Sequence, residues 1–240
     1  MNFKNLISQT ITAFLNFKIS RKSLRRKSYQ KKYRMSLRNW LIYHQKKVVF
    51  DKVSWMGLPV WKNVLDAWIY QEIIYETRPD ILIEIGSKFG GSTRYFADLF
   101  ELLRHGMVIS IDLDRSEYRL EHDRVTLITG NSSDPQVVNQ VECLCRGKRV
   151  MVIQDGGHKK NQVYQDLLNY SPFVSLENYF IVEDGIVDLF HFGDGLGFDT
   201  SGPLDAVEEF LKNHPNFVQD DSRERYLLTY NPKGYLKRIS

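Results

Sequence analysis

The 240-residue sequence predicts an α/β protein with a Rossmann-like, doubly wound and mostly parallel sheet that has helices on both faces. Three observations support this prediction. Short apolar runs alternate with longer segments whose apolar residues recur at helical spacing. The alternating units follow one another with no internal repeat. The first apolar run, ILIEI, passes directly into GSKFGGS, a glycine-rich turn of the kind that cradles a nucleotide in such sheets.

The elements follow in a regular order. Residues 62–77 carry apolar groups at helical spacing, and Pro79 stops this helix just before a strand at 81–85. The elements expected after it are a helix at 93–104, strands at 107–111 and 125–128, a helix at 134–145, a strand at 149–153, a helix at 159–170, a strand at 178–182 and a helix at 203–213. Repeated strand–helix units favour parallel strands, whose carboxyl ends form the ligand-binding edge of the sheet.

Charge divides the chain into a basic, partly helical arm at residues 1–50 and an α/β domain at residues 51–240. The arm holds 13 Lys and Arg and no acidic residue, whereas the remainder has 20 basic against 29 acidic residues. Near its start, apolar residues fall on one helical face: Phe3, Ile7, Ile11, Phe14 and Leu15. The arm is expected to be solvated or packed on the body, with peripheral contact to an anionic membrane and a transit peptide as alternatives. No nucleic-acid recognition module accompanies the basic residues, so nucleic-acid binding is not expected.

Two cysteines, Cys143 and Cys145, form neither a disulfide framework nor a zinc ligand set. This cysteine usage favours a reducing compartment. No apolar run reaches the length of a membrane span. The expected location is therefore the cytoplasm, with the basic arm as the one feature that suggests contact with a membrane.

The glycine-rich turn is the first candidate ligand site. Gly86, Gly90 and Gly91 can adopt positive φ and allow the main chain to approach a ligand. Ser92 suits the first turn of the following helix, whose free N–H groups would face the site. Glu84 is a carboxylate in an otherwise apolar strand, so it is expected to face a ligand rather than the core.

Polar residues at the next strand ends extend this site. Asp112 follows the second strand and is placed to accept hydrogen bonds from a ribose diol. Asn131 and Ser132, in the loop GNSSDP, either meet an adenine edge or simply begin the next helix, and the loop alone favours the second reading. The G-x-x-x-G-G spacing departs from the G-x-G-x-x-G of NAD-binding folds, which shifts the prediction toward S-adenosylmethionine.

Three acids at adjacent strand ends predict a metal site. Asp155 lies in VMVIQDGGH, and Glu183 and Asp184 lie in YFIVEDG, with no Lys or Arg beside them in sequence. A single acid at a strand end often caps a helix or faces solvent. Three acids that converge beside a cofactor turn favour a bound cation instead. Oxygen ligands with open positions suit Mg²⁺ better than Zn²⁺.

His158 is the candidate general base, three residues after Asp155. It would remove a proton from a substrate hydroxyl whose acidity the metal has raised. A histidine that caps the following helix is the simpler alternative. Lys159 and Lys160 compete for the role of base but are expected to be solvated.

Several separated motifs together resemble the cephalosporin hydroxylase family, a branch of the class I S-adenosylmethionine-dependent methyltransferases that includes rhamnosyl O-methyltransferases. The resemblance covers about residues 50–240. The motifs are W-x-G-x-P at 55–59, DAWIYQEIIYETRPDILIEIGSKFGGS at 66–92, ISIDLD at 109–114, QDGGHKKNQVYQDLLNYSPFVSLENYFIVEDG at 154–185, and GPLDAVEEFL with RERYLLTYNPKGYLKR within 202–238.

The resemblance implies methyl transfer from S-adenosylmethionine to a hydroxyl of a sugar or natural product, with Mg²⁺ as the second cofactor. The cofactor-binding residues expected on both grounds are Glu84, Gly86, Ser87, Gly90, Gly91, Ser92, Asp112, Asn131, Ser132 and Asp155, and the metal ligands are Asp155, Glu183 and Asp184. Catechol-type O-methyltransferases have a similar metal pattern with a lysine base where this chain has His158, which argues against a catechol acceptor. The family also makes a homo-oligomer an expectation.

Three further functions are consistent with parts of the sequence. A hydroxylase of the cephalosporin type would need a non-haem iron site, and His191 with Asp194 lacks the two histidines and carboxylate that such a site uses. The second is a non-catalytic cofactor-binding protein, and the third is a scaffold that attaches to membranes through the arm.

The segment 186–203 is predicted to be a substrate loop. Its residues Phe190, His191, Phe192 and Phe198 either stack on an acceptor or close the core. Trp55 and Trp61 belong to the pocket or, by preference, to the core.

Overall fold

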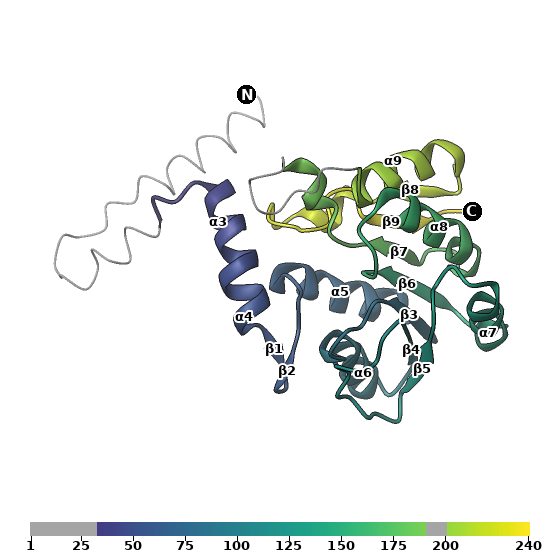
Figure 1. Ribbon diagram of the computed structural model, residues 1–240. Coiled ribbons are helices and arrows are strands. Elements are labelled where there is room, and N and C mark those ends of the chain that lie inside the picture. The colour runs from purple at the N-terminus through teal and green to yellow at the C-terminus, as the bar shows by residue number, and fades with distance from the viewer. Residues whose placement is uncertain (1–32, 191–200) are drawn as a thin grey trace. The chain divides into compact units, whose positions relative to one another are not determined.

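The computed structural model describes residues 33–190 and 201–240 (Figure 1). The chain divides at residue 40, and the second unit, residues 41–240, contains the sheet. The predicted boundary at residue 50 therefore falls inside this second unit, while residues 1–32 of the predicted arm, with all five apolar residues singled out there, lie outside the described part. Among the described residues, no helix is long and apolar enough to cross a membrane.

Helical turns and a short hairpin precede the main fold. Helix α3 (Leu37–His44) continues through a π-helical turn (Gln45–Val49) into α4 (Phe50–Lys52). Strands β1 (Ser54–Trp55) and β2 (Leu58–Pro59) form an antiparallel pair. Their connection is tight because Met56 and Gly57 both have positive φ. The hairpin leads the chain to Lys62 and Asn63, which begin the first long helix.

The strand and helix order agrees closely with the sequence prediction. Asn63 caps helix α5 (Val64–Thr77) by accepting a hydrogen bond from Leu65 N at 3.2 Å. The elements that follow are β3 (Ile81–Ile85), α6 (Gly91–Leu103), β4 (Met107–Asp112), β5 (Val125–Thr129), α7 (Pro135–Cys145), β6 (Val150–Gln154), α8 (Lys160–Tyr170), a 3₁₀ turn (Ser171–Phe173), β7 (Tyr179–Val182), a 3₁₀ turn (Gly185–Leu189), α9 (Pro203–Asn213), β8 (Phe217–Gln219), a 3₁₀ turn (Asp221–Glu224) and β9 (Tyr235–Arg238).

Seven strands form one sheet in the order β5-β4-β3-β6-β7-β9-β8. The first five are mutually parallel, and β9 and β8 join antiparallel at one edge. The strand order reverses between β3 and β6, which is where open α/β sheets bind ligands at the carboxyl ends of their strands. The predicted Rossmann-like fold is confirmed, although the sequence analysis did not anticipate β8 and β9.

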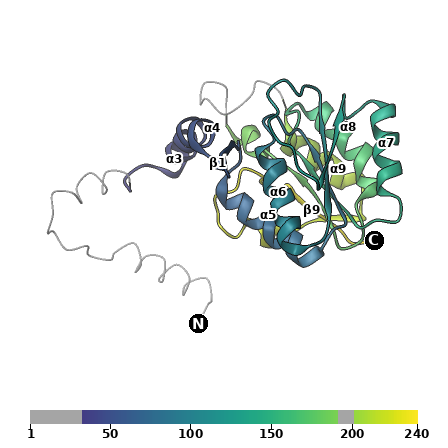
Figure 2. The same ribbon diagram turned by 90° about the horizontal axis from the view of Figure 1, so that it is seen from below.

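Helices cover both faces of the sheet (Figure 2), and an apolar layer lies between the helices and the sheet on each face. Helices α5 and α6 pack on one face against Leu82 and Ile153, and α7, α8 and α9 pack on the other against Ile83 and Val152. Alternate residues of each strand therefore face opposite layers. Because residues 82 and 84 share a face, Glu84 points toward α6.

Asp66, in the first turn of α5, ties this helix to the C-terminal segment. Its carboxylate accepts hydrogen bonds from the side chains of Asn63, Thr229 and Tyr235 at 2.9, 2.6 and 2.9 Å, and from the backbone N–H of Tyr230 at 2.8 Å. Burial raises the pKa of Asp66, against these hydrogen bonds, which lower it. The carboxylate thus holds residues 229–235 beside the start of α5.

Replacing Asp66 with alanine is expected to lower the free energy of unfolding by about 3 kcal/mol, because several buried donors lose their acceptor at once. Urea unfolding followed by tryptophan fluorescence measures this loss. Asp123→Ala, at an exposed position before β5, is the control and should change stability by less than about 0.5 kcal/mol. Equal losses in the two variants would contradict the assigned role of Asp66.

Candidate active site

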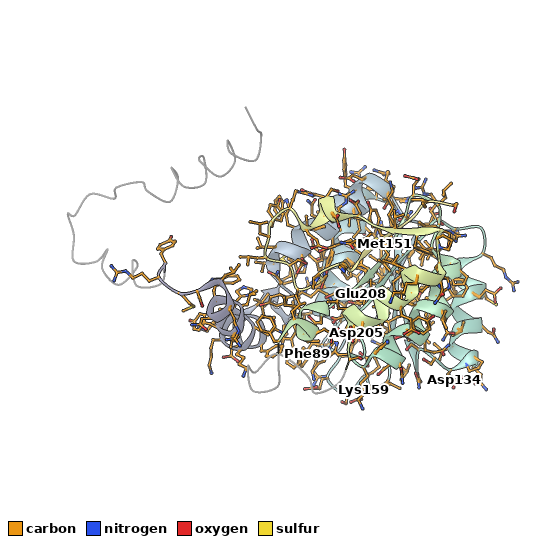
Figure 3. The ribbon with its side chains drawn as sticks, turned by 90° about the horizontal axis from the view of Figure 1, so that it is seen from above. Phe89, Asp134, Met151, Lys159, Asp205 and Glu208 are labelled. Atoms are coloured by element: carbon orange, nitrogen blue, oxygen red, sulfur yellow. The ribbon has the colours of Figure 1, made fainter. Side chains whose placement is uncertain are left out.

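A cavity of about 620 Å³ opens at the carboxyl ends of β3, β4 and β6. This volume lies within the range typical of small-molecule sites. The predicted residues that line it are Gly86, Ser87, Ser92, Asp112, Asn131, Ser132, Asp155, His158 and Asp184. Phe89 and Lys159, from the loops that follow β3 and β6, lie at the same edge of the molecule in Figure 3. Four predicted site residues, Glu84, Gly90, Gly91 and Glu183, are not part of the lining.

The packing of the protein around the turn leaves no space for side chains at Gly86, Gly90 and Gly91. Gly86 has a φ of +87°, and a side chain there would overlap the backbone of Asp155. Gly90, at φ +84°, lies against Tyr118, and a side chain on Gly91 would overlap the carbonyl of Pro59. The expectation that these glycines bring the main chain close to a ligand therefore needs correction for Gly90 and Gly91. They allow the turn to pack against the hairpin and the loop after β4.

Glu84 also lies differently from the expectation that it faces a ligand. Its side chain is fully buried, and one carboxylate oxygen accepts a short hydrogen bond from the Thr93 hydroxyl at the start of α6. Burial raises the pKa of Glu84, and attraction to Lys62 and hydrogen bonds from α6 oppose this shift. Glu84 therefore links β3 to α6 from behind the cavity wall.

Asp112 binds the backbone of the glycine turn. Its Oδ2 accepts hydrogen bonds from the N–H groups of Ser87 and Lys88, both at 2.8 Å. Burial works to raise the pKa of Asp112, but these backbone hydrogen bonds outweigh it and the pKa is lowered. Arg115 supports the same turn by donating to Ser87 Oγ at 2.5 Å. Asp112 is therefore ionised and positions the turn, and its role toward a ribose stays a prediction.

Asp166, a buried acid on α8, binds the loop that follows β5. Ser132 Oγ donates to Asp166 Oδ1 at 2.6 Å, and Gln154 Nε2 lies 3.4 Å from Asp166 Oδ2. Asn131 accepts a hydrogen bond from Ser133 N at 3.0 Å, which shapes the loop locally. Asp166 thus connects the loop that follows β5 to the end of β6, beside the cavity. The sequence analysis did not identify this residue.

Asp166 predicts a pH-dependent term in stability. Burial raises the pKa of Asp166 from 3.8 to about 6, so the folded state favours the neutral carboxyl group. The folded state then binds more protons than the unfolded state between these values, and stability falls as pH rises. Relative to Asp166→Asn, the wild type should lose about 2.4 kcal/mol between pH 4 and pH 7. Chemical unfolding of both proteins across this range measures the difference, and a difference that does not vary with pH would contradict the prediction.

Asp155, His158 and Asp184 form the candidate metal site. One ligand atom from each lies within 4.8 Å of the other two, and His158 Nε2 is 3.7 Å from Asp184 Oδ2. Asp184 adopts a left-handed conformation with φ +58° at the turn that follows β7. Burial and repulsion by Asp155 raise the pKa of Asp184 to about 6. Two carboxylates and an imidazole converge here on one face of the cavity, a donor set that fits a divalent cation.

Lys62 is the residue that the sequence analysis missed. Its Nζ lies 2.8 Å from Asp155 Oδ2 and 2.5 Å from Glu183 Oε1. Although no Lys or Arg lies beside these acids in sequence, Asp155 and Glu183 therefore share a positive partner in the fold. Glu183, expected as a metal ligand, is buried and paired with Lys62, and its role toward a metal stays a prediction. The three residues are far apart in sequence, and only the position of Lys62 just before α5 could have suggested that it lies at the ligand-binding edge.

Of the two tryptophans considered for the pocket, Trp55 packs against the core and Trp61 lines the cavity. Trp55 donates to Asp98 at 2.7 Å and packs on Tyr95, away from the cavity lining. Trp61 lines the cavity and contacts Phe50 and Phe89, with ring centroids 4.9 and 5.1 Å away.

The predicted substrate loop is described only in part. Ile186 and Val187 contribute to the cavity, while His191, Phe192, Asp194 and Phe198 lie outside the described residues. Any contribution of those four side chains to the acceptor site stays a prediction.

Comparison with known proteins identifies a consistent set of relatives. A family model described as "Rhamnosyl O-methyltransferase/CmcI" matches residues 47–239. A rhamnosyl O-methyltransferase of Mycobacterium tuberculosis is 31% identical over 201 residues, which cover 80% of each chain. The rhamnosyl O-methyltransferase of Mycobacterium leprae is 29% identical over 202 residues, which cover 79% of this chain and 85% of that one.

Solved structures agree with this family at the level of the fold. A structure of CmcI described as an Mg-SAM form has a TM-score of 0.63 at 22% identity and covers 80% of this chain and 78% of that one. A structure of CmcI with SAH has a TM-score of 0.60 at 22% identity, with coverage of 80% and 84%.

Proposed function

Because the chain belongs to the Rhamnosyl O-methyltransferase/CmcI family, we propose that its cavity binds S-adenosylmethionine and a divalent cation and transfers a methyl group to a hydroxyl of a sugar acceptor. The chain is an O-methyltransferase that depends on S-adenosylmethionine and Mg²⁺. The observation that carries the proposed site is the meeting, in one cavity, of the glycine turn after β3 with the Asp155–His158–Asp184 cluster.

The cofactor is assigned to the side of the cavity bordered by β3, β4 and β5. Ser87 and Ser92 of the turn and Asn131 and Ser132 of the loop after β5 offer polar groups there, and Asp112 fixes the turn. S-adenosylmethionine has a ribose, an adenine and an amino acid end, and the polar groups on this side of the cavity can form hydrogen bonds with them. Glu84, Gly90 and Gly91 support this turn through contacts with the protein, and any contact that they make with the cofactor stays a prediction.

The metal is assigned to Asp155, Asp184 and the predicted ligand Glu183, with His158 beside them. When bound, the cation would lower the pKa of an acceptor hydroxyl that coordinates it. His158 takes the hydroxyl proton as the acceptor oxygen attacks the sulfonium methyl carbon. A carbon–oxygen bond forms, the sulfur–carbon bond breaks, and the sulfur keeps the electron pair as a neutral thioether. Asp155 and Asp184 would hold the cation that orients the acceptor hydroxyl toward the methyl group, and such positioning supplies much of the rate.

The acceptor is assigned to the side of the cavity where Trp61 and Phe50 lie. Both aromatic rings line the cavity and are more than two-fifths exposed. Exposed aromatic rings suit the apolar C–H face of a sugar ring. The relatives are named for a rhamnosyl acceptor, so a rhamnoside is the first acceptor to test. A hydroxylase is less well supported, because the metal-ligand cluster of the described residues contains a single histidine.

Calorimetry and a methyl-transfer assay test this proposal. The full-length protein, treated with EDTA and dialysed, is titrated with S-adenosylmethionine and then with Mg²⁺. It is then incubated with both and with rhamnosides or other hydroxylated glycosides. We expect binding of both ligands and formation of S-adenosylhomocysteine that requires an acceptor and Mg²⁺. Failure to bind S-adenosylmethionine would overturn the proposed function, and turnover that is insensitive to EDTA would overturn the metal assignment.

A further inference from the structure

Lys62 is a buried ammonium group inside the candidate metal site. Its side chain is only 2% exposed, and its Nζ lies between Asp155 Oδ2 and Glu183 Oε1 at 2.8 and 2.5 Å. These distances are those of charge-assisted hydrogen bonds. The amine therefore sits in direct contact with two of the three acids that the sequence assigns to Mg²⁺.

The chain fixes Lys62 in this place. The next residue, Asn63, caps α5 and donates to the carbonyl of Leu228 and to Asp66, both at 2.9 Å. Asp66 in turn binds Thr229 and the backbone of Tyr230. The start of α5 and the C-terminal segment therefore form one hydrogen-bonded unit. The side chain of Lys62 extends from this unit to the carboxylates of Asp155 and Glu183.

The charges explain why an ammonium group is found there. Asp155, Glu183 and Asp184 place three acids beside one another, and buried carboxylates without a positive partner are strongly destabilising. With its Nζ 2.8 and 2.5 Å from two of these carboxylates, the Lys62 ammonium group supplies one of the positive charges that a divalent cation would otherwise supply.

We propose that the Lys62 ammonium group occupies the cation position between Asp155 and Glu183 when no metal is bound, and that a divalent cation has to displace it. This inference rests on the proposed function, since it concerns the same metal site. Lys62 is then a positioning residue that holds both carboxylates in place in the metal-free protein. Its charge limits the affinity for the metal. Removal of that charge should strengthen metal binding.

Calorimetric titration of Mg²⁺ into metal-free wild type and Lys62→Met tests the inference, together with thermal unfolding of both proteins with and without Mg²⁺. We expect Lys62→Met to bind Mg²⁺ at least about 10-fold more tightly, equivalent to about 1.4 kcal/mol. Its melting temperature should fall without metal and recover with Mg²⁺ by more than that of the wild type. Lys88→Met is the control, because it removes the same charge from an exposed lysine that also lines the cavity.

The outcomes separate this inference from the proposed function. If the wild type binds Mg²⁺ and Lys62→Met binds it equally or more weakly, the inference is overturned and the metal site stands. If neither protein binds Mg²⁺, the inference and the proposed metal site are both overturned. If Lys62→Met does not fold alone, Mg²⁺ should restore folding, and Lys62→Gln, which keeps an N–H donor for Glu183, should show the same tighter binding. Failure of Mg²⁺ to rescue either variant would also overturn it.

Discussion

Replacement of Asp155 with asparagine is expected to reduce kcat/KM for methyl transfer by about 1,000-fold and to weaken Mg²⁺ binding by at least about 100-fold. Asp155 belongs to the metal-ligand cluster, and its Oδ2 lies 2.8 Å from Lys62 Nζ. Asparagine keeps the shape of the side chain but removes its negative charge, so both the cation and Lys62 lose a charged partner. Calorimetry measures the metal affinity, and initial rates at varied Mg²⁺ measure the reaction.

Two controls make this result specific. S-adenosylmethionine affinity, measured without metal, should change by less than about threefold, because the variant keeps its fold and the cofactor turn. Asp123→Asn, an exposed acid before β5, should behave as the wild type does in both assays. A metal affinity close to that of the wild type in Asp155→Asn would show that the cation binds elsewhere.

The fold could be predicted where local pattern and tertiary context agree. The strand at 81–85 and the helix at 203–213 have the predicted bounds, because an apolar run and an amphipathic period bounded by Pro and Gly leave few alternatives. The antiparallel edge of the sheet could not be predicted from its local sequence. Strand β8 has only three residues, and β9 reads YLKR, with both charged residues only partly buried. Pairing between such short segments depends on the neighbouring strand rather than on their own sequence.

The site was predictable as far as strand topology determines it. Parallel strands end at one edge of the sheet, so acids and histidine placed just after β6 and β7 had to approach one another, and Asp155, His158 and Asp184 do so. Glu84 shows the limit of this reasoning. It lies within β3 rather than after it, so the period-two alternation of the strand directs it toward α6, where Thr93 binds it.

The partner of an acid is harder to predict than its position. Lys62 lies 93 residues before Asp155 and 121 before Glu183, and it reaches both because Asn63 and Asp66 fix the start of α5 against the C-terminal segment. Absence of a basic neighbour in sequence says nothing about such a contact. Asp166 is similar, since its role depends on Ser132 and Gln154, which come from two separate elements. Long-range polar contacts of this kind appear only once the chain is folded.

Replacement of His158 with glutamine is expected to lower kcat by about 100- to 10,000-fold, the range typical for loss of a general base. Glutamine cannot take up a proton at neutral pH, although it fills a similar volume. S-adenosylmethionine affinity should change by less than about twofold, since His158 belongs to the metal cluster beside Asp184. Rapid-quench measurement of a single turnover isolates the chemical step from product release.

The same variant separates the two roles that the geometry allows for His158. If His158 is the base, Mg²⁺ affinity of His158→Gln should stay within about threefold of the wild type, in contrast to Asp155→Asn. If His158 is instead a metal ligand, both variants should lose metal affinity together. His158→Lys provides the second measurement. An ammonium group must lose a proton before it can accept one, so the activity of this variant should rise with pH well above neutrality if position 158 acts as a base. Activity of the lysine variant that does not vary with pH, combined with weakened Mg²⁺ binding, would assign His158 to the metal and leave the removal of the acceptor proton to another group.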